Sequence, residues 1–144
     1  MVSACLLGEN CKYNGGNNLS QKVLDFTKGH EVIPVCPEVL GGLPTPRIPS
    51  EIVNGTVTSK SGKNVDKEFR RGANTCLKMA KENDVDLVIL QSRSPSCGVK
   101  NIYDGSFSGK IIEGKGIFAR LLDKNGFKII DVEDLSNLSK QSYN

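Results

Sequence analysis

The chain has 144 residues, a length typical of a single domain that buries an apolar core without disulfides or metals. Hydrophobic residues make up 38% of the sequence and charged residues 24%, which excludes an intrinsically disordered chain. The net charge is +3 and the basic residues are scattered, so we expect no nucleic-acid partner. No apolar run approaches the ~20 residues of a membrane span, and the first residues do not resemble a signal peptide. We therefore expect a cytoplasmic protein without a membrane partner, whose thiols stay reduced.

The first half of the chain predicts short elements separated by loops rich in glycine, asparagine and proline. Ser20 is a typical helix N-cap and Gly29 a typical helix end, so a helix is expected between them. In chain order, the expected elements are a buried strand over 1–7, a loop over 8–19, a helix over 20–28, a strand over 31–36, a long irregular loop over 37–49 and an edge hairpin over 51–64.

The second half contains the clearest helix, over residues 65–82. Its apolar side chains recur at steps of three and four and form one stripe: Val65, Phe69, Ala73, Cys76, Leu77 and Ala80. The remaining elements are a strand over 86–91, a loop with a short hairpin over 92–110, a helix over 116–124 closed by Gly126, and a strand over 127–132. Strands that alternate with helices predict an α/β fold, a Rossmann-like three-layer domain over 1–144 with a mostly parallel sheet flanked by helices.

Three cysteines follow expected strands. Cys5 lies at the end of the first strand, Cys36 ends the second, and Cys97 lies in the loop after the strand over 86–91. In an open parallel α/β sheet, ligands bind outside the carboxyl ends of the strands. A single cysteine of this kind is most simply a buried apolar residue, but three at equivalent positions favour a binding site. We therefore expect the three thiols to converge on one edge of the sheet.

The chemistry of such a site follows from its ligand set. Structural zinc normally takes four ligands, often as C-x2-C pairs, whereas this sequence has no such pair and a single histidine, His30. Three cysteines suit an iron–sulfur cluster in which one iron has no protein ligand and acts as a Lewis acid. Of the other cysteines, Cys76 lies on the apolar helix stripe and is expected in the core. Cys11 lies in a polar loop and is expected to be an exposed spare thiol, with an accessory ligand as the alternative.

Two loops near these cysteines carry candidate catalytic groups. Glu38 lies two residues after the second cysteine, where its carboxylate is suited to take up or deliver a proton. Arg47 and Glu51 are expected either to pair with each other or to anchor a polar substrate. Ser94 and Ser96 precede the third cysteine, and their hydroxyls are suited to hydrogen-bond a substrate, a cluster sulfur or the local backbone. The alternative for these serines is an ordinary Ser-Pro turn.

The blocks of sequence that surround these residues occur in a fixed order. They are Ser3-Ala4-Cys5-Leu6-Leu7-Gly8, Tyr13-Asn14-Gly15, Cys36-Pro37-Glu38, Gly41-Gly42-Leu43-Pro44-Thr45-Pro46-Arg47, Pro49-Ser50-Glu51 and Ser94-Pro95-Ser96-Cys97-Gly98. Together they resemble a widespread bacterial family, long known as a domain of unknown function, that includes thiouracil desulfidase. The resemblance covers nearly the whole chain and fades after about residue 133.

The resemblance implies a [4Fe-4S] cluster and the removal of sulfur from a thiolated pyrimidine such as 2-thiouracil, which gives the oxo base and sulfide. It also implies that a glutamate and a serine transfer protons. Matched by motif, the groups are the cluster ligands Cys5, Cys36 and Cys97, the glutamate Glu38 with Glu51 as the alternative, and the serine Ser94 with Ser96 as the alternative. The expected partner is a small-molecule thiolated base, and the expected state is a monomer or a homodimer.

Some residues differ from the family pattern. Lys12 and Asn14 stand where the resemblance leads us to expect arginine and aspartate, and Cys11 replaces an apolar residue. These changes leave the cluster ligands in place and concern the choice of substrate. Two other functions fit the same thiols. One is a non-catalytic metal- or sulfide-handling protein that binds zinc or a transient cluster, and the other is a thiol redox protein that uses a low-pKa Cys97.

Overall fold

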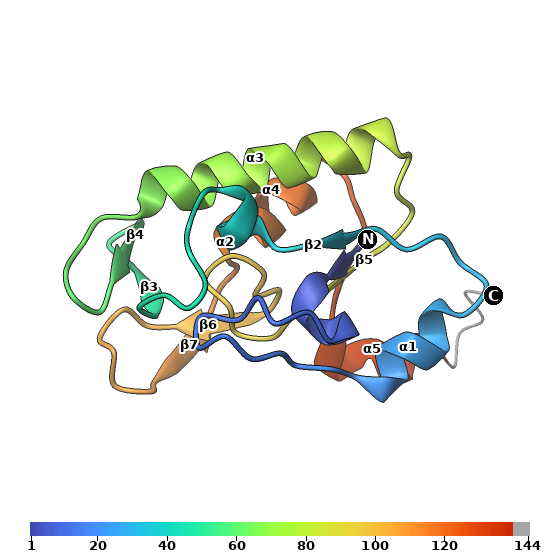
Figure 1. Ribbon diagram of the computed structural model, residues 1–144, viewed down its shortest axis with the longest axis horizontal. Coiled ribbons are helices and arrows are strands. Elements are labelled where there is room, and N and C mark those ends of the chain that lie inside the picture. The colour runs from blue at the N-terminus through green and yellow to red at the C-terminus, as the bar shows by residue number, and fades with distance from the viewer. Residues whose placement is uncertain (140–144) are drawn as a thin grey trace.

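The computed structural model describes residues 1–139 and is built around a four-stranded sheet (Figure 1). The strand order is β2-β1-β5-β8, and every pairing in this sheet is parallel. The strands are short: β1 is Val2–Ser3, β2 is Pro34–Val35, β5 is Val88–Leu90 and β8 is Ile129–Asp131. In the register of the sheet, Val2 lies opposite both Pro34 and Ile89. The expected α/β fold with a parallel sheet is therefore confirmed.

Helices cover both faces of the sheet. The helices α3 (Asp66–Glu82) and α4 (Ile117–Lys124) pack on one face, and α1 (Gln21–Thr27) and α5 (Leu135–Ser139) pack on the other (Figure 1). Two 3₁₀ helices, η1 (Ala4–Leu7) and η2 (Val132–Asp134), follow β1 and β8. This arrangement confirms the three layers and the helices expected over 20–28, 65–82 and 116–124.

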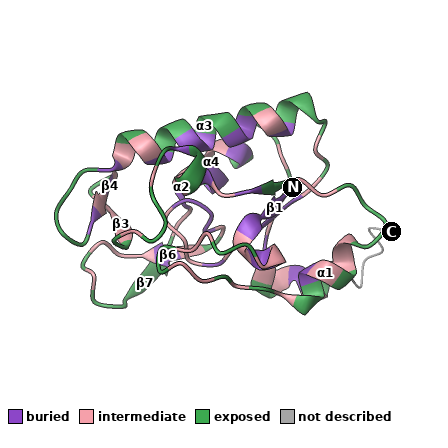
Figure 2. Cartoon of the chain, in the orientation of Figure 1, coloured by how far each residue is buried: buried purple, intermediate pink, exposed green. Residues whose placement is uncertain are grey.

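The core reflects this layering. The central strand β5 is buried on both faces, as parallel strands between helical layers usually are. Val88 and Leu90 belong to the cluster on the α3–α4 side, whereas Ile89 belongs to the cluster on the α1–α5 side. The buried stripe of α3, which includes Cys76, faces α4 and the sheet (Figure 2). Cys76 is fully buried, so its expected place in the core is confirmed.

Two antiparallel hairpins lie together at one end of the molecule (Figure 1). The first joins β3 (Ser50–Val53) to β4 (Thr56–Ser59), close to the hairpin expected over 51–64. The second joins β6 (Asn101–Tyr103) to β7 (Ile111–Glu113), and it extends three residues beyond the segment in which a short hairpin was expected. A third apolar cluster, which contains Val57, Val65 and Phe69, attaches the first hairpin to α3.

Two segments differ from the expectation. The strand expected over 1–7 ends at Ser3, and η1 then turns Leu6 back into the core beneath the sheet. The loop expected over 37–49 begins with a short helix, α2 (Pro37–Leu40). Its proline, Pro37, occupies the first turn of the helix, where a backbone N–H would have no acceptor within the helix, so its absence costs no hydrogen bond. The backbone of this helix packs directly against α3, which a sequence rich in proline and glycine does not indicate.

The strand order places a topological switch at the centre of the sheet. From β1 the chain continues to β2 on one side and then crosses to β5 on the other, so the connections diverge between β1 and β5. A crevice at the carboxyl ends of such strands is the usual ligand site of an open α/β sheet. Within residues 1–139, no helix is long and apolar enough to cross a membrane. The expected domain spans 1–144, of which residues 140–144 lie outside the described part.

Candidate functional site

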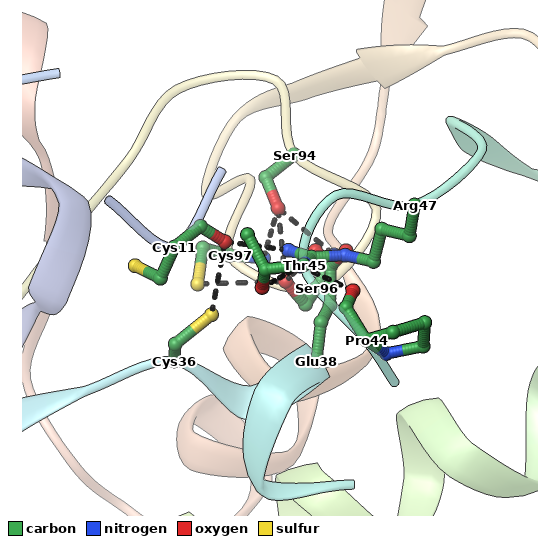
Figure 3. Close-up of polar contacts among 9 residues, drawn as sticks. All are labelled: Cys11, Cys36, Glu38, Pro44, Thr45, Arg47, Ser94, Ser96 and Cys97. Atoms are coloured by element: carbon green, nitrogen blue, oxygen red, sulfur yellow. Dashed lines mark hydrogen bonds and ion pairs between the residues drawn. The ribbon is translucent and has the colours of Figure 1, made fainter. Parts of the chain in front are cut away.

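A cavity of about 510 Å³ opens at the switch point. The segments that follow β1, β2 and β5 line it, and so do residues of both hairpins. Cys5 reaches it from η1, Cys36 from the residue before α2, and Cys97 from the loop after β5. The structure thus brings together the three cysteines that the sequence places after strands, and Figure 3 shows two of them within the polar network of the site.

The three thiols differ in environment. The Asn18 amide donates a hydrogen bond to Cys5 Sγ at 3.6 Å, yet burial raises the pKa of the Cys5 thiol. Cys97 is only 4% exposed, and burial raises its pKa strongly, with the Cys5 and Cys36 thiols adding to the effect. A low-pKa Cys97 is therefore wrong, which removes the basis for the thiol redox hypothesis at that residue.

Cys36 has the most acidic thiol of the site. The Cys36 thiol donates to the Cys11 carbonyl at 3.8 Å, and the neighbouring Cys11 thiol lowers the pKa of Cys36 to about 7, against the opposing effect of burial. The Val39 backbone N–H, in the first turn of α2, also lowers it. The same contact between the two thiols raises the pKa of Cys11. Cys36 is thus the thiol that ionises most readily near neutral pH.

The expectation that Cys11 is exposed is wrong. Cys11 is only partly exposed and lines the same cavity beside Cys36, as Figure 3 shows, which is the location that the alternative of an accessory ligand requires. The loop that carries it is held down by Arg47. Its side chain donates to the Cys11 carbonyl at 2.8 Å, and its backbone N–H donates to the Tyr13 carbonyl at 2.7 Å. These contacts join residues more than 30 positions apart, so no local pattern could have indicated them.

Arg47 also fixes the candidate acid–base group. Its Nε donates to Glu38 Oε1 at 3.1 Å, and the two side chains are only 7% and 15% exposed. Its Nη1 donates to the Pro44 carbonyl and to Thr45 Oγ1, so the guanidinium is held on several sides (Figure 3). Arg47 therefore pairs with Glu38 and not with Glu51, which corrects one expectation for these loops.

A second hydrogen bond links Glu38 to the serine loop. Ser96 Oγ donates to Glu38 Oε2 at 2.9 Å and lies 2.9 Å from Ser94 Oγ. Ser94 Oγ in turn accepts the backbone N–H groups of Ser96 and Cys97 at 3.1 and 3.0 Å. Glu38, Ser96 and Ser94 therefore form one hydrogen-bonded row along the cavity (Figure 3). The two serines left as alternatives by the sequence are both in this row.

The start of α4 holds the serine loop in place. The backbone N–H of Ile117 donates to the Pro95 carbonyl at 2.8 Å, and that of Phe118 donates to the Ser96 carbonyl at 2.9 Å. A Cβ atom at Gly116 would lie 2.5 Å from the carbonyl carbon of Ser96, so the close approach requires glycine there. The free N–H groups of the helix terminus thus fix the backbone beside Cys97.

Glu51 does not pair with Arg47 and instead binds the second hairpin. Its Oε1 accepts the backbone N–H groups of Gly105 at 2.9 Å and Phe107 at 3.1 Å. These two residues lie in the loop between β6 and β7, so Glu51 ties the second hairpin to the first. Glu51 lines the cavity together with Tyr103 and Phe107. No motif or spacing in the sequence indicated that either aromatic residue lines the site.

Comparison with known proteins identifies the family. The model of the 2-thiouracil desulfurase family matches residues 1–134. The chain belongs to this family. One relative is the uncharacterized protein YbbK of Bacillus subtilis (strain 168), which is 39% identical over 148 residues, with 96% of this chain and 98% of YbbK covered. A similar solved structure is the [4Fe-4S]-dependent thiouracil desulfidase TudS, with a TM-score of 0.90 and 37% identity over 97% of this chain and 94% of that one. The family suggested by the sequence blocks is thus confirmed.

The thiols can also be compared with the needs of different metal groups. Among residues 1–139, no three or more His, Cys, Asp or Glu side chains are grouped closely enough to hold one metal ion. An iron–sulfur cluster needs thiolates that are farther apart, because each thiolate binds a separate iron. Three thiols spread around one cavity fit a cluster better than a single zinc ion.

Proposed function

We propose that the protein is a [4Fe-4S]-dependent desulfidase that removes sulfur from a thiolated pyrimidine of the 2-thiouracil type, giving the oxo base and sulfide. The observation that carries this proposal is the convergence of Cys5, Cys36 and Cys97 on one cavity that also holds a partly buried carboxylate and two hydroxyls. Membership of the 2-thiouracil desulfurase family and the likeness to TudS support it.

The cysteines would hold the cluster, one thiolate to each of three irons. When bound, such a cluster leaves one iron without a protein ligand, which supplies a Lewis acid for the thiocarbonyl sulfur. Cys36 is the thiol best prepared for this role, because its pKa of about 7 favours the thiolate. All five cysteines of the chain are free. We also infer a cytoplasmic location, where a reducing environment keeps such thiols available.

The protein's own groups would manage the protons. In the overall reaction the C–S bond of the thiocarbonyl breaks, a C–O bond forms from water, and sulfur leaves as sulfide, so no electron donor is required. A proton released by the attacking water at Ser94 has a path to Glu38 through Ser96, because the three side chains are joined by hydrogen bonds of 2.9 Å. Arg47 keeps the Glu38 carboxylate turned toward Ser96. Ser94 and Glu38 therefore act at the two ends of one proton path.

The proposal is tested by anaerobic reconstitution with iron and sulfide, followed by sulfide-release assays over a panel of thiolated bases. We expect brown wild-type protein that is active, and serine variants of Cys5, Cys36 or Cys97 that bind little iron. Glu38→Gln and Ser94→Ala should keep their iron but lose activity by a factor on the order of 10²–10⁴. Asn74→Ala, on the exposed side of α3 and away from the cavity, is the control. Colourless protein with stoichiometric zinc would instead favour a metal-handling protein.

A further inference from the structure

The loop between β6 and β7, residues 104–110, has features that desulfidation chemistry does not require. Its Phe107 has a φ of 56°, in the left-handed region that side chains other than glycine and asparagine rarely adopt. Such a conformation is strained and persists where the surrounding structure enforces it. A glycine would adopt it without strain, as Gly105 and Gly109 do in the same loop. The presence of an aromatic side chain, and not glycine, at this strained position therefore needs a structural explanation.

Packing in the apolar core does not explain why Phe107 occupies this position. Within residues 1–139, Phe107 is not part of any of the three buried apolar clusters, and it remains partly exposed. It does line the cavity that holds the three cysteines, and so does Tyr103 at the end of β6. The chain has only five phenylalanines, three tyrosines and no tryptophan. Three of these eight aromatic residues, Tyr13, Tyr103 and Phe107, thus line the cavity, and the last two belong to the β6–β7 hairpin.

The loop is fixed in place by contacts with β3. Glu51 Oε1 accepts two of its backbone N–H groups, from Gly105 and Phe107. Gly105 approaches β3 so closely that a Cβ atom there would lie 2.6 Å from the Ile52 carbonyl oxygen. The carboxylate accepts both donors on one oxygen, and charged hydrogen bonds of this kind are roughly twice as strong as neutral ones. Glu51 thus enforces the strained backbone that carries Phe107.

We propose that Tyr103 and Phe107 form an aromatic wall that binds a flat heteroaromatic thiocarbonyl compound in preference to an acyclic one, and that Glu51 is the positioning residue for this wall. This inference rests on the proposed function, which identifies the thiocarbonyl as the reacting group of the ligand. The wall itself acts through stacking on the ring of the ligand. Base–aromatic stacking is sensitive to the planar ring and tolerant of its substituents, so the wall selects a class of compound and not one base.

The test compares two ligands in four proteins: wild type, Phe107→Leu, Glu51→Ala and the control Phe26→Leu. The control makes the same change in another partly exposed phenylalanine, which packs in the cluster on the α1–α5 side. Binding of 2-thiouracil and of thiourea, the acyclic compound, is measured by equilibrium dialysis with cluster-free protein. KM and kcat for 2-thiouracil are then measured after reconstitution.

We expect Phe107→Leu to weaken binding of 2-thiouracil and to raise its KM by about tenfold, which corresponds to the lower part of the range for one stacked base. The kcat should change by less than about twofold, and thiourea binding should not change. Glu51→Ala should raise KM in the same way and also speed tryptic cleavage after Lys110, because the loop loses its anchor. Phe26→Leu should leave all these values at the wild-type level.

The results separate this proposal from the proposed function. If Phe107→Leu binds 2-thiouracil like wild type, or loses thiourea equally, the aromatic wall is refuted even in an active desulfidase. If reconstituted wild type releases no sulfide from any thiolated base but Phe107→Leu still weakens 2-thiouracil binding, the wall stands and the desulfidase proposal fails. If the wild type neither binds nor converts 2-thiouracil, both are refuted.

Discussion

The packing of α2 against α3 leads to a specific prediction for Gly72→Ala. A Cβ atom at Gly72 would lie 1.7 Å from the Pro37 carbonyl oxygen, and one at Gly41 would lie 1.9 Å from the Glu68 carbonyl oxygen. Both obstacles are backbone atoms, so no side chain can turn aside to make room. Real Cβ contacts essentially never fall below 3.0 Å, and α2 must therefore move away from α3 by more than 1 Å.

Two opposing effects set the size of the loss. Alanine in a helix interior is favoured over glycine by about 1 kcal/mol, whereas overpacking costs about 1–3 kcal/mol and more where backbone must move. We expect the free energy of unfolding to fall by about 2 kcal/mol, measured by urea denaturation of cluster-free protein. The same shift would separate Glu38 from Ser96, whose hydrogen bond is 2.9 Å, and would displace Cys36. Iron bound after reconstitution should therefore fall as well.

The control is Asn74→Ala, on the exposed side of the same helix, where only helix propensity and one exposed hydrogen bond to the Arg70 carbonyl change. Its unfolding free energy should stay within about 0.5 kcal/mol of the wild type. Gly72→Ala protein that is as stable as Asn74→Ala and binds the same amount of iron would refute the close packing of α2 on α3. The position of Glu38 would then need another explanation.

Two further predictions concern other parts of the molecule. In cluster-free protein the Cys36 pKa of about 7 should make Cys36 the first thiol alkylated by iodoacetamide, with a rate that rises with pH and reaches half its maximum near pH 7. Cys11→Ala should move that midpoint to higher pH, and an unchanged midpoint in peptide mass mapping would contradict the effect of the Cys11 thiol. Ser92→Ala should lower the free energy of unfolding by about 1–3 kcal/mol, because the buried Asp131 carboxylate loses a donor at 2.8 Å. Urea denaturation should show no such loss for the exposed Ser108→Ala.

The sequence predicted the parts of the fold that depend on local patterns. The apolar stripe of α3 and the cap at Ser20 are set by spacing along the chain, and both are found in the structure. The convergence of Cys5, Cys36 and Cys97 followed from a general property of parallel sheets, whose strand ends share one edge. These predictions depend on local spacing and on a general rule for parallel sheets, so they do not require knowing which residues distant in sequence are in contact.

The parts that could not be predicted depend on contacts between distant segments. The helix α2 is held by backbone packing on α3, over a separation of about 30 residues. Ser96 contacts Glu38 across 58 positions, which no spacing rule connects. Cys11 enters the cavity because Arg47 binds its carbonyl. In each case a buried polar or backbone group finds its partner only when the fold is complete, so the sequence offered alternatives where the structure shows one arrangement.

The cavity is built from two structural units with different tasks. The parallel sheet and its helices place the three thiols in the segments that follow the strand ends. The hairpins carry Tyr103, Phe107 and Glu51. They join the rest of the chain through loops, one small apolar cluster, a β-bridge between β6 and Arg93, and a hydrogen bond from a backbone N–H of β4 to Asp66. Under the two proposals above, substitutions in the hairpins should change which ring is bound without moving the thiols, whereas substitutions at the strand ends should change whether a cluster is held. A family with one chemistry and several substrates would be expected to vary in the first unit and not in the second.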